Sequence, residues 1–275
     1  MGKRIICYRP SPNVHCFSLT GGKCELQCPH CMGKHLRAMK PTLTPKELSV
    51  AFRTAQVNGA GCILLSGGFG MDGRLPVSSF IETLAQAKME TGLKVEAHLG
   101  LLDDQEVERL GRAGVDAFLL DIVGDQNTID HYLGGTWRIE DYARVIGAAK
   151  KWIPTVAPHV LIGVEGGNVK GEYKAIDIAA SARVDSLAIL ALVHENLEVN
   201  IEEVEKVMQY ARDRMRSHLT LGCMRGSGKM RLSLEKMAVA LGFDGIANPA
   251  KETVEYAKSL GLLIVEKEGC CVFAP

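Results

Sequence analysis

Three cysteines lie within eight residues near the start of the chain, in the segment Thr20-Gly-Gly-Lys-Cys24-Glu-Leu-Gln-Cys28-Pro-His-Cys31. Three thiolates on one folded loop can bind one metal centre and leave a coordination position without a protein ligand. In a four-iron cluster, that position is one iron open to an exogenous ligand. The spacing therefore predicts a metal site that carries out chemistry.

Three other interpretations of these cysteines stay open. The pair in Cys28-Pro-His-Cys31 matches the dithiol pattern of thioredoxin-like oxidoreductases, but that pattern leaves Cys24 unexplained. A structural zinc site needs a fourth ligand, which His30, His35 or a distant cysteine can supply. The third alternative is chance clustering of unreactive thiols.

The elements that must position this loop alternate between apolar strands and amphipathic helices. Strands separated by helices require parallel pairing with right-handed crossovers. The pattern predicts an α/β fold, a (β/α)8 TIM-type barrel with as few as six regular strands, whose chemistry lies at the carboxyl ends of the strands. We expect strands at 14–20, 61–66, 94–98, 117–123, 158–164, 186–193, 218–222 and 244–247, and helices near 45–58, 76–90, 103–113, 138–151, 171–182, 200–216, 231–241 and 251–260.

No linker or charge block divides the chain, so we expect a single domain over residues 1–275. It would consist of an N-terminal extension (1–13), the barrel (14–260) and a C-terminal tail (261–275), with both ends covering the mouth of the barrel. Helix signals support these boundaries: Thr44-Pro45-Lys46-Glu47 forms a capping box with proline at the first helical position. Glycine follows the periodic segments that end before Gly59, Gly92, Gly114, Gly242 and Gly261.

Composition limits the classes of partner. The 32 Lys+Arg residues balance 32 Asp+Glu residues, so there is no general attraction to nucleic acid or to an anionic membrane. No signal peptide and no run of eighteen apolar residues is present, and we expect a cytoplasmic protein. An odd count of nine cysteines in that reducing compartment favours metal or redox chemistry over disulfides.

The cysteine spacing after the first strand of the barrel is similar to the signature of the radical S-adenosylmethionine (SAM) enzymes. The resemblance implies a [4Fe-4S] cluster on Cys24, Cys28 and Cys31, with SAM at the open iron. The cluster would reductively cleave SAM to a 5′-deoxyadenosyl radical that abstracts a hydrogen atom.

The same resemblance implies roles for other residues. His30 would lie beside the adenine, and Ser66-Gly67-Gly68 is similar to the Gly-Gly-Glu motif that binds the methionyl amino group, with Phe69 in place of the acid. Gly163 and Glu165 belong to a segment similar to the one that packs along the adenosine, although Glu165 alternatively is a solvated acid at the rim.

Two further candidate site residues follow from their places at strand ends, where a barrel positions functional groups. His98 ends one expected strand, and Asp121 lies near the end of the next. Asp121 would contact the ribose or the substrate, and the alternative is a helix cap or a salt bridge.

Within the superfamily, Asp121-Ile-Val-Gly124-Asp125, Pro158-His159-Val160 and Gly222-Cys223-Met224-Arg225 resemble the biotin-synthase-like group, and most closely the two-component, archaeal-type lipoyl synthases. That resemblance implies sulfur insertion into octanoyl chains on a lipoyl carrier protein or domain. It also implies a companion synthase subunit and an electron donor such as ferredoxin or flavodoxin.

It further implies a second, auxiliary [4Fe-4S] cluster, for which Cys223, Cys270 and Cys271 are the candidate ligands. The alternative is that these cysteines are small buried thiols, as Cys7, Cys16 and Cys62 can be. The chain would then resemble a biotin-synthase-like, hydrogenase-maturase-like or methylornithine-synthase-like enzyme acting on a small molecule. An alternative outside enzymes is a zinc-stabilised barrel that only binds a ligand.

Overall fold

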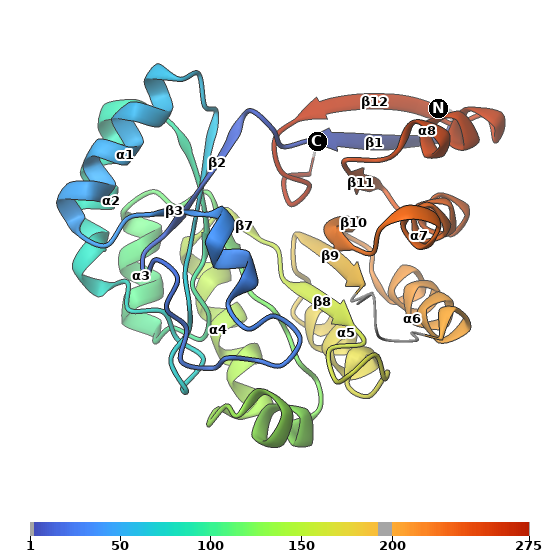
Figure 1. Ribbon diagram of the computed structural model, residues 1–275, viewed down its shortest axis with the longest axis horizontal. Coiled ribbons are helices and arrows are strands. Elements are labelled where there is room, and N and C mark those ends of the chain that lie inside the picture. The colour runs from blue at the N-terminus through green and yellow to red at the C-terminus, as the bar shows by residue number, and fades with distance from the viewer. Residues whose placement is uncertain (1–2, 192–199, 275) are drawn as a thin grey trace. The chain divides into compact units, whose positions relative to one another are not determined.

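The computed structural model describes residues 3–191 and 200–274 as an α/β protein with two parallel sheets (Figure 1). The last two residues of the strand expected at 186–193 lie outside the described residues. Contacts divide the chain into two compact units. Unit 1 comprises Met1–Ser11, Ile122–Asp125 and Pro158–Pro275, and unit 2 comprises Pro12–Asp121 and Gln126–Ala157. The assignment of one domain to the whole chain stays a prediction.

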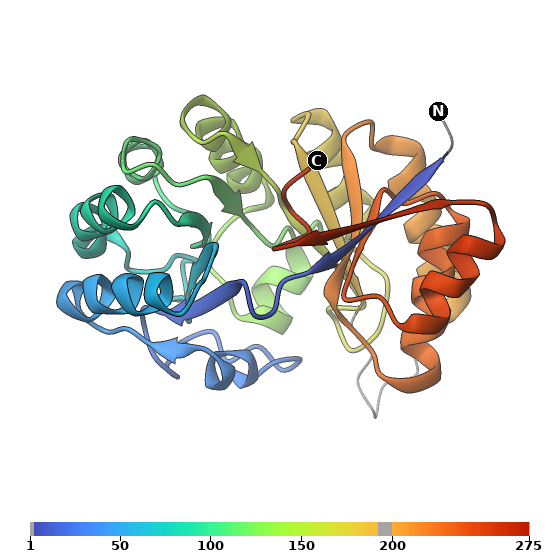
Figure 2. The ribbon, with the colours of Figure 1, turned by 90° about the horizontal axis from the view of Figure 1, so that it is seen from above.

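Unit 2 contains a six-stranded sheet in the order β3-β2-β4-β5-β6-β7, with every pair parallel. Its helices α1–α4 lie along one face of this sheet (Figure 2). The strands are β2 (Val14–Ser18), β3 (Lys40–Pro41), β4 (Cys62–Ser66), β5 (Lys94–His98), β6 (Ala117–Leu119) and β7 (Thr155–Val156). The helices are α1 (Pro45–Val57), α2 (Ile81–Thr91), α3 (Asp104–Arg112) and α4 (Ile139–Trp152), with short 3-10 helices at Lys34–Ala38 and Ser78–Phe80 and a π-helix at Thr128–Leu133.

Unit 1 contains the second six-stranded sheet, in the order β12-β1-β11-β10-β9-β8, also parallel throughout. The strands are β1 (Arg4–Arg9), β8 (His159–Ile162), β9 (Ser186–Ala191), β10 (His218–Arg225), β11 (Gly245–Ala247) and β12 (Leu263–Glu268). The helices are α5 (Glu172–Ser181), α6 (Ile201–Arg214), α7 (Gly228–Ala240) and α8 (Lys251–Ser259).

The predicted α/β fold is confirmed, and each of the eight expected strands and eight expected helices is present. Boundaries differ by a few residues: the strand expected at 117–123 ends at Leu119, and the helix expected at 76–90 begins at Ile81 after a 3-10 turn. The structure adds β1 and β12, which pair with each other in the segments that the sequence assigned to the extension and the tail.

The start of α1 shows how local sequence signals determine where a helix begins. The Thr44 hydroxyl accepts a hydrogen bond from the Glu47 amide at 3.2 Å, and the Thr44 amide donates to the Glu47 carboxylate at 3.1 Å. These two bonds satisfy amide groups that have no partner within the helix. Leu48 and Phe52 on the same helix are fully buried, and each contributes about 1.5–3 kcal/mol from removal of apolar surface from water.

No helix in the described part of the chain is long and apolar enough to cross a membrane.

Candidate active site

The three cysteines of the predicted cluster site lie on a turn-rich loop after the carboxyl end of β2. Cys24, Cys28 and Cys31 carry half-buried, free thiols. The Cys28 carbonyl accepts hydrogen bonds from the amides of Cys31 and Met32, both at 2.9 Å, which folds the loop back on itself. Gln27 and Met32 have left-handed backbone conformations with φ of 44° and 46°, which is uncommon for residues other than glycine. The backbone of the loop therefore holds two residues in conformations that are uncommon for their types.

The electrostatics of Cys28 show that the three thiols influence one another. Burial, with smaller contributions from the neighbouring Cys31 and Cys24, raises the pKa of the Cys28 thiol to about 12. A thiol in this environment is protonated near neutral pH and loses its proton when a metal binds. The loop thus has the donor set of a thiolate metal site.

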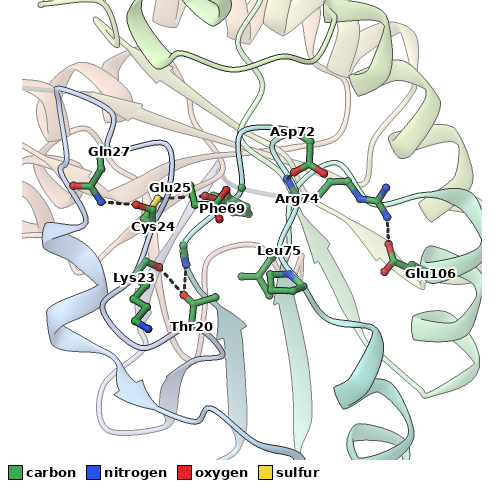
Figure 3. A pocket seen from close by; sticks show the side chains of 13 residues that line it. Thr20, Lys23, Cys24, Glu25, Gln27, Phe69, Asp72, Arg74, Leu75 and Glu106 are labelled. Atoms are coloured by element: carbon green, nitrogen blue, oxygen red, sulfur yellow. Dashed lines mark hydrogen bonds and ion pairs between the residues drawn. The ribbon is translucent and has the colours of Figure 1, made fainter.

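The loop after β4 is hydrogen-bonded to the cysteine loop. The Thr20 hydroxyl accepts a hydrogen bond from the Gly68 amide at 2.7 Å and donates to the Lys23 carbonyl at 2.9 Å (Figure 3). The Phe69 carbonyl accepts from the Glu25 amide at 3.0 Å, and the Cys24 thiol lies 3.8 Å from the same oxygen. These contacts bind the two loops into one backbone framework.

Gly68 is the closest point between the two loops. A Cβ atom at this position would lie 2.0 Å from the Lys23 carbonyl and 2.5 Å from the Cys24 Cα. No side chain fits there, so the backbone of Cys24 rests directly on Gly68. Gly67 is also crowded, because a Cβ atom there would lie 2.6 Å from Leu75 and 3.0 Å from Thr20. The predicted Gly67-Gly68 pair thus positions the cysteine loop, and its contact with the methionyl amino group stays a prediction.

A pocket of about 770 Å³ opens between these loops (Figure 3). Of the three cysteines, its lining contains only Cys24, together with charged side chains from both loops and from α3. Arg74 crosses the pocket wall and pairs with Asp103 at 2.8 Å and Glu106 at 2.5 Å. The pocket is large enough for a small ligand and is lined by both signs of charge.

His30, the residue predicted beside the adenine, stacks on Tyr132 from the π-helix. The two ring centroids are 6.2 Å apart and the planes differ by 7°. Such a parallel pair offers the type of flat aromatic surface on which a base can lie. Sequence reasoning did not identify Tyr132, because it lies about a hundred positions away and only the fold brings it to the loop.

Ser66, His98 and Asp121 form a polar chain across the carboxyl ends of β4, β5 and β6. The Ser66 hydroxyl lies 3.4 Å from His98 Nδ1, and His98 Nε2 lies 3.4 Å from the Asp121 carboxylate. The predicted salt-bridge alternative for Asp121 is thus present in the structure, and its contact with a ribose or a substrate stays a prediction.

The electrostatic effect of Asp121 on His98 can be tested. The pKa of His98 is raised from its ordinary 6.5, because the charge of Asp121 and the hydrogen bond to it together outweigh burial, which is the largest single influence and lowers the pKa. Asp121→Asn is therefore expected to bring the His98 pKa below 6.5, measured by NMR titration of the imidazole. Asp104→Asn, which removes an exposed acid paired with Arg144, serves as the control.

The raised pKa of His98 determines how the stability of the protein depends on pH. Protonated His98 with its partner stabilises the fold below the unfolded pKa of about 6.5, and this contribution is lost as pH rises through the higher folded value. Asp121→Asn should thus lower the free energy of unfolding more at pH 5.5 than at pH 8. An unchanged His98 pKa in the variant would contradict this assignment.

The remaining predicted SAM contacts, Gly163 and Glu165, belong to unit 1 and follow β8. The Gly163 amide donates to the Glu172 carboxylate at 2.8 Å, and its φ of 79° favours glycine. The Glu165 carboxylate pairs with Lys170 at 2.8 Å. This turn is internally bonded, and the roles of both residues toward SAM stay predictions.

The second set of predicted ligands lies at the carboxyl edge of the unit 1 sheet. Cys223 lies near the end of β10, while Cys270 and Cys271 follow β12. Surrounding protein raises the pKa of the Cys223 thiol, and Cys271 raises it further. Burial raises the pKa of the Tyr8 hydroxyl, and Cys271 and Cys270 add to the effect. Cys271 and Cys270 also pack with Tyr8 in one apolar cluster.

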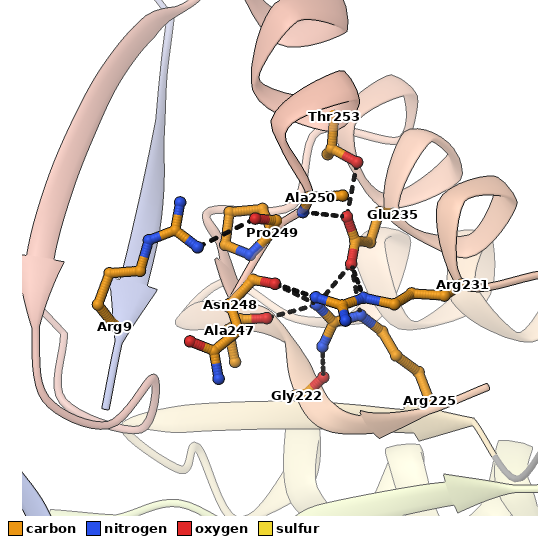
Figure 4. A network of polar contacts seen from close by, with 10 residues as sticks. All are labelled: Arg9, Gly222, Arg225, Arg231, Glu235, Ala247, Asn248, Pro249, Ala250 and Thr253. Carbon is orange, nitrogen blue, oxygen red and sulfur yellow. Dashed lines mark hydrogen bonds and ion pairs between the residues drawn. The ribbon is translucent and has the colours of Figure 1, made fainter. Parts of the chain in front are cut away.

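A buried ion-pair network fixes the backbone beside Cys223 (Figure 4). The Arg225 guanidinium donates to Glu235 at 2.7 Å and to the carbonyls of Gly222 and Ala247, both at 2.5 Å. Arg231 binds the same Glu235 oxygen at 2.7 Å. Arg225, the last residue of β10, and Arg231 of α7 are therefore both engaged with this carboxylate and with backbone carbonyls.

Cys7, Cys16 and Cys62 lie inside strands β1, β2 and β4. Burial raises the pKa of Cys7 to about 11. The Cys62 thiol lies 3.3 Å from the buried Glu96 carboxylate, and burial raises its pKa as well. Strand positions and suppressed ionisation are typical of thiols that serve as small apolar side chains.

A parallel α/β fold and a three-thiol loop at the carboxyl end of its first expected strand define a metal-dependent α/β enzyme class. The family model of the radical SAM superfamily matches residues 18–170, more than half of the chain. The chain belongs to the radical SAM superfamily. Membership implies a [4Fe-4S] cluster and SAM as cofactors, and the loop thiols fit that cluster.

Solved structures share this fold at low sequence identity. Methylornithine synthase (PylB) is 13% identical, with a TM-score of 0.60 over 95% of this chain and 84% of that chain. The [FeFe]-hydrogenase maturase HydG is 15% identical, with a TM-score of 0.63 over 89% of this chain and 56% of HydG. Streptococcus suis SuiB bound to S-adenosylmethionine is 12% identical, with a TM-score of 0.53 over 94% of this chain and 50% of SuiB.

These similarities show the fold. The chain spans only about half the length of HydG and of SuiB. The comparison with curated proteins gives no significant match.

Proposed function

We propose that this chain is the radical SAM subunit of a lipoyl-synthase-type system and inserts sulfur into octanoyl chains on a lipoyl carrier protein or domain. The observation that supports the proposal is a second group of thiols in unit 1: Cys270 and Cys271 pack with Tyr8, and Cys271 lies close enough to Cys223 to raise its pKa. Sulfur insertion needs a sulfur source in addition to the radical site, and an auxiliary [4Fe-4S] cluster on these cysteines would provide it.

The proposed roles in unit 2 follow from the two connected loops. Cys24, Cys28 and Cys31 would bind the first cluster, while Gly68 and Thr20 hold their backbone in place. When bound, this cluster supplies the electron for reductive cleavage of SAM, which yields the 5′-deoxyadenosyl radical that abstracts hydrogen. His30 with Tyr132 would orient the adenine, and Ser66, Gly67 and Gly68 would bind the methionyl end.

The other proposed contacts complete SAM binding and the second cluster. Asp121, oriented by His98, would bind the ribose, and Gly163 and Glu165 would lie along the adenosine. Arg225 fixes the carbonyl of Gly222 and so the backbone that presents Cys223. Its positive charge lowers the pKa of Cys223 against the larger, opposing effect of the surrounding protein, which favours the thiolate that a cluster requires.

The proposal includes partners and a location. The substrate would be an octanoyl-lysyl carrier, a companion synthase subunit would share the reaction, and an electron donor of ferredoxin or flavodoxin type would reduce the first cluster. A cytoplasmic setting suits thiol ligands, because that compartment keeps thiols reduced.

A second candidate is a one-cluster enzyme acting on a small molecule. Its support is the match in length to methylornithine synthase, of which the chain covers 84%. In that case Cys223, Cys270 and Cys271 would be ordinary thiols. The match of residues 18–170 to the radical SAM superfamily does not favour a barrel that only binds zinc.

Metal content separates these candidates. Protein prepared without oxygen is expected to contain about eight irons and eight sulfides per chain for two clusters, against about four for one. Changing Cys223, Cys270 and Cys271 together to alanine should reduce the content to about four and leave SAM cleavage intact. An iron content that does not change in this triple variant would contradict the auxiliary cluster.

Activity tests the substrate. With SAM, a reductant and the companion subunit, an octanoyl-lysyl peptide or carrier protein should gain sulfur, detected by mass. The triple variant should consume SAM without thiolating the octanoyl chain. Thiolation by the triple variant at the wild-type rate would exclude these cysteines as the sulfur source.

A further inference from the structure

The segment that carries Cys270 and Cys271 forms neither a helix nor a strand, so other contacts must fix its position. It follows β12, which pairs with β1 (Figure 1). The pairing ends where the Gly269 amide donates to the Arg9 carbonyl at 3.0 Å. Gly269 has a φ of 102°, a conformation that favours glycine, and the chain leaves the strand there. We call residues 270–274 the thiol segment.

A chain of hydrogen bonds holds the far end of the thiol segment. The Tyr8 hydroxyl donates to the Phe273 carbonyl at 3.0 Å and lies 2.8 Å from His218 Nε2. Burial lowers the pKa of His218, so its ring is neutral near pH 7 and carries a single N–H. Because the one hydroxyl proton of Tyr8 goes to the carbonyl, His218 must donate through Nε2. The hydrogen bonds therefore run from His218 to Tyr8 to Phe273.

Lys267 adds a second contact to the same carbonyl. Its ammonium donates to the Phe273 carbonyl at 3.1 Å and to the Ala274 carbonyl at 3.2 Å. The ammonium also lies 5.7 Å from the centre of the Tyr8 ring, within the range of a cation–π interaction. The thiol segment is thus anchored on both sides of its two cysteines, after β12 and at Phe273.

The strand register explains how Tyr8 reaches His218. Gly245 of β11 pairs with Ile6 of β1 on one side and with Thr220 of β10 on the other. Tyr8 and His218 lie two positions from these partners, so alternation along the strands places them on the same face of the sheet. A Cβ atom at Gly245 would lie 2.6 Å from Tyr8 Cε2. The buried Tyr8 ring crosses β11 because Gly245 has no side chain.

The Tyr8 ring also supports the thiols themselves. Tyr8 and Cys271 belong to one buried apolar cluster, and Cys270 packs against it. Cys271 in turn lies close enough to Cys223 to raise the pKa of that thiol. The side chain that anchors the thiol segment is therefore also the one on which its cysteines pack.

We propose that Tyr8, held by His218, is a positioning residue for the second group of thiols. Its hydroxyl fixes the thiol segment through the Phe273 carbonyl, and the fixed segment presents two of the three proposed ligands to the auxiliary cluster. Neither Tyr8 nor His218 binds iron in this arrangement, because both act through the backbone of the segment. The inference rests on the proposed function.

Tyr8→Phe tests the role of the hydroxyl, because it keeps the ring that packs against Cys271. In metal-free protein, alkylation of Cys270 and Cys271 by iodoacetamide is expected to become about tenfold faster, since loss of a buried hydrogen bond releases the segment. Mass spectrometry of peptides measures the rate at each thiol. The matched control is Tyr256→Phe, which removes a hydroxyl from α8 in the same unit and should leave both rates unchanged.

Cys7 provides an internal reference in the same experiment. This buried thiol of β1 is the chain neighbour of Tyr8 and reacts only when the strand itself opens. Its rate should stay at the wild-type value in Tyr8→Phe. An equal increase at Cys7, Cys270 and Cys271 would mean that the variant only destabilises unit 1, and would overturn the positioning role.

Two variants of His218 test the hydrogen bond that it donates. His218→Leu removes the donor to Tyr8 and should also make alkylation of the thiol segment faster. His218→Gln retains an N–H donor and should restore most of the wild-type protection. Equal alkylation rates in the two variants would contradict a hydrogen bond from His218 as the support of Tyr8.

Iron content of protein loaded without oxygen gives a second readout. In Tyr8→Phe it is expected to fall from about eight per chain toward about four, while SAM cleavage stays within about twofold of wild type. Sulfur insertion into the octanoyl carrier should fall together with the auxiliary iron. Full iron content and full sulfur insertion in this variant would overturn the inference.

The outcomes separate this inference from the proposed function. Wild-type protein that contains only about four irons per chain contradicts the auxiliary cluster, and therefore both the proposed function and this inference. Wild-type protein with about eight irons, together with unchanged thiol reactivity in Tyr8→Phe, overturns only the positioning role.

Discussion

Replacing Cys28 with alanine is expected to abolish cluster binding on the loop and with it the formation of 5′-deoxyadenosine. Two thiols cannot fill the three positions that the protein must supply to a four-iron cluster. Alanine preserves the Cys28 carbonyl, which accepts hydrogen bonds from Cys31 and Met32, so the loop keeps its fold. Iron at this site should fall from about four per chain to near zero.

The matched control is Cys16→Ala. Cys16 is a half-buried thiol in β2, the strand that precedes the loop, and it is not among the proposed ligands. This variant should keep the iron content and SAM cleavage of the wild type. SAM cleavage that survives in Cys28→Ala but not in Cys16→Ala would reverse the assignment of the ligands.

Proton release gives the same prediction a second readout. Because the Cys28 thiol has a pKa of about 12, it is protonated in the metal-free protein at neutral pH. Binding of ferrous iron must displace that proton, so the affinity of the wild-type loop for iron should increase as pH rises. Cys28→Ala should reduce the number of protons released on binding.

The helices and the central strands could be predicted from sequence because their signals are local. The capping box at Thr44 and the glycines that follow several helices mark boundaries within a few residues of where the structure has them. Strand β12 was not predicted, because it lies at the edge of a sheet and none of its residues is fully buried. It is a strand because β1 pairs with it, and that pairing connects opposite ends of the chain.

In the candidate site, too, local patterns could be predicted from sequence and long-range contacts could not. The spacing of the cysteines identified the loop, since three ligands within eight residues are a local pattern. The residues that hold the loop were not identifiable, because Thr20 meets Gly68 and His30 meets Tyr132 only after the sheet has formed. Serine, threonine, glycine and tyrosine are also too common for their types alone to indicate such contacts.

Replacing Glu235 with alanine is expected to destabilise the protein by about 3–5 kcal/mol, because it leaves a buried guanidinium without its counter-charge. The side chains of Arg225 and Glu235 are 1% and 0% exposed. The other Glu235 oxygen accepts hydrogen bonds from the Ala250 amide at 2.8 Å and the Thr253 hydroxyl at 2.6 Å (Figure 4). Loss of this carboxylate therefore breaks the connection between the ends of β10 and β11 and the start of α8.

Denaturant unfolding of the metal-free protein measures this loss. The control is Glu255→Ala, which removes an acid from an exposed pair with Lys251 on α8 and should cost no more than about 1 kcal/mol. Equal effects of the two variants would show that the buried network contributes no more than a surface pair.

The pH dependence provides an independent check of the same network. Burial alone would raise the pKa of Glu235, but hydrogen bonds from Arg231, Thr253, Ala250 and Arg225 together lower it below its ordinary 4.5. A lowered folded pKa stabilises the protein above the unfolded value, and this contribution is lost as pH falls through the folded value. The difference in stability between wild type and Glu235→Gln should therefore be full near pH 7 and shrink below about pH 4.5. A difference that stays constant down to pH 3 would mean that the ionised carboxylate is not what stabilises this network.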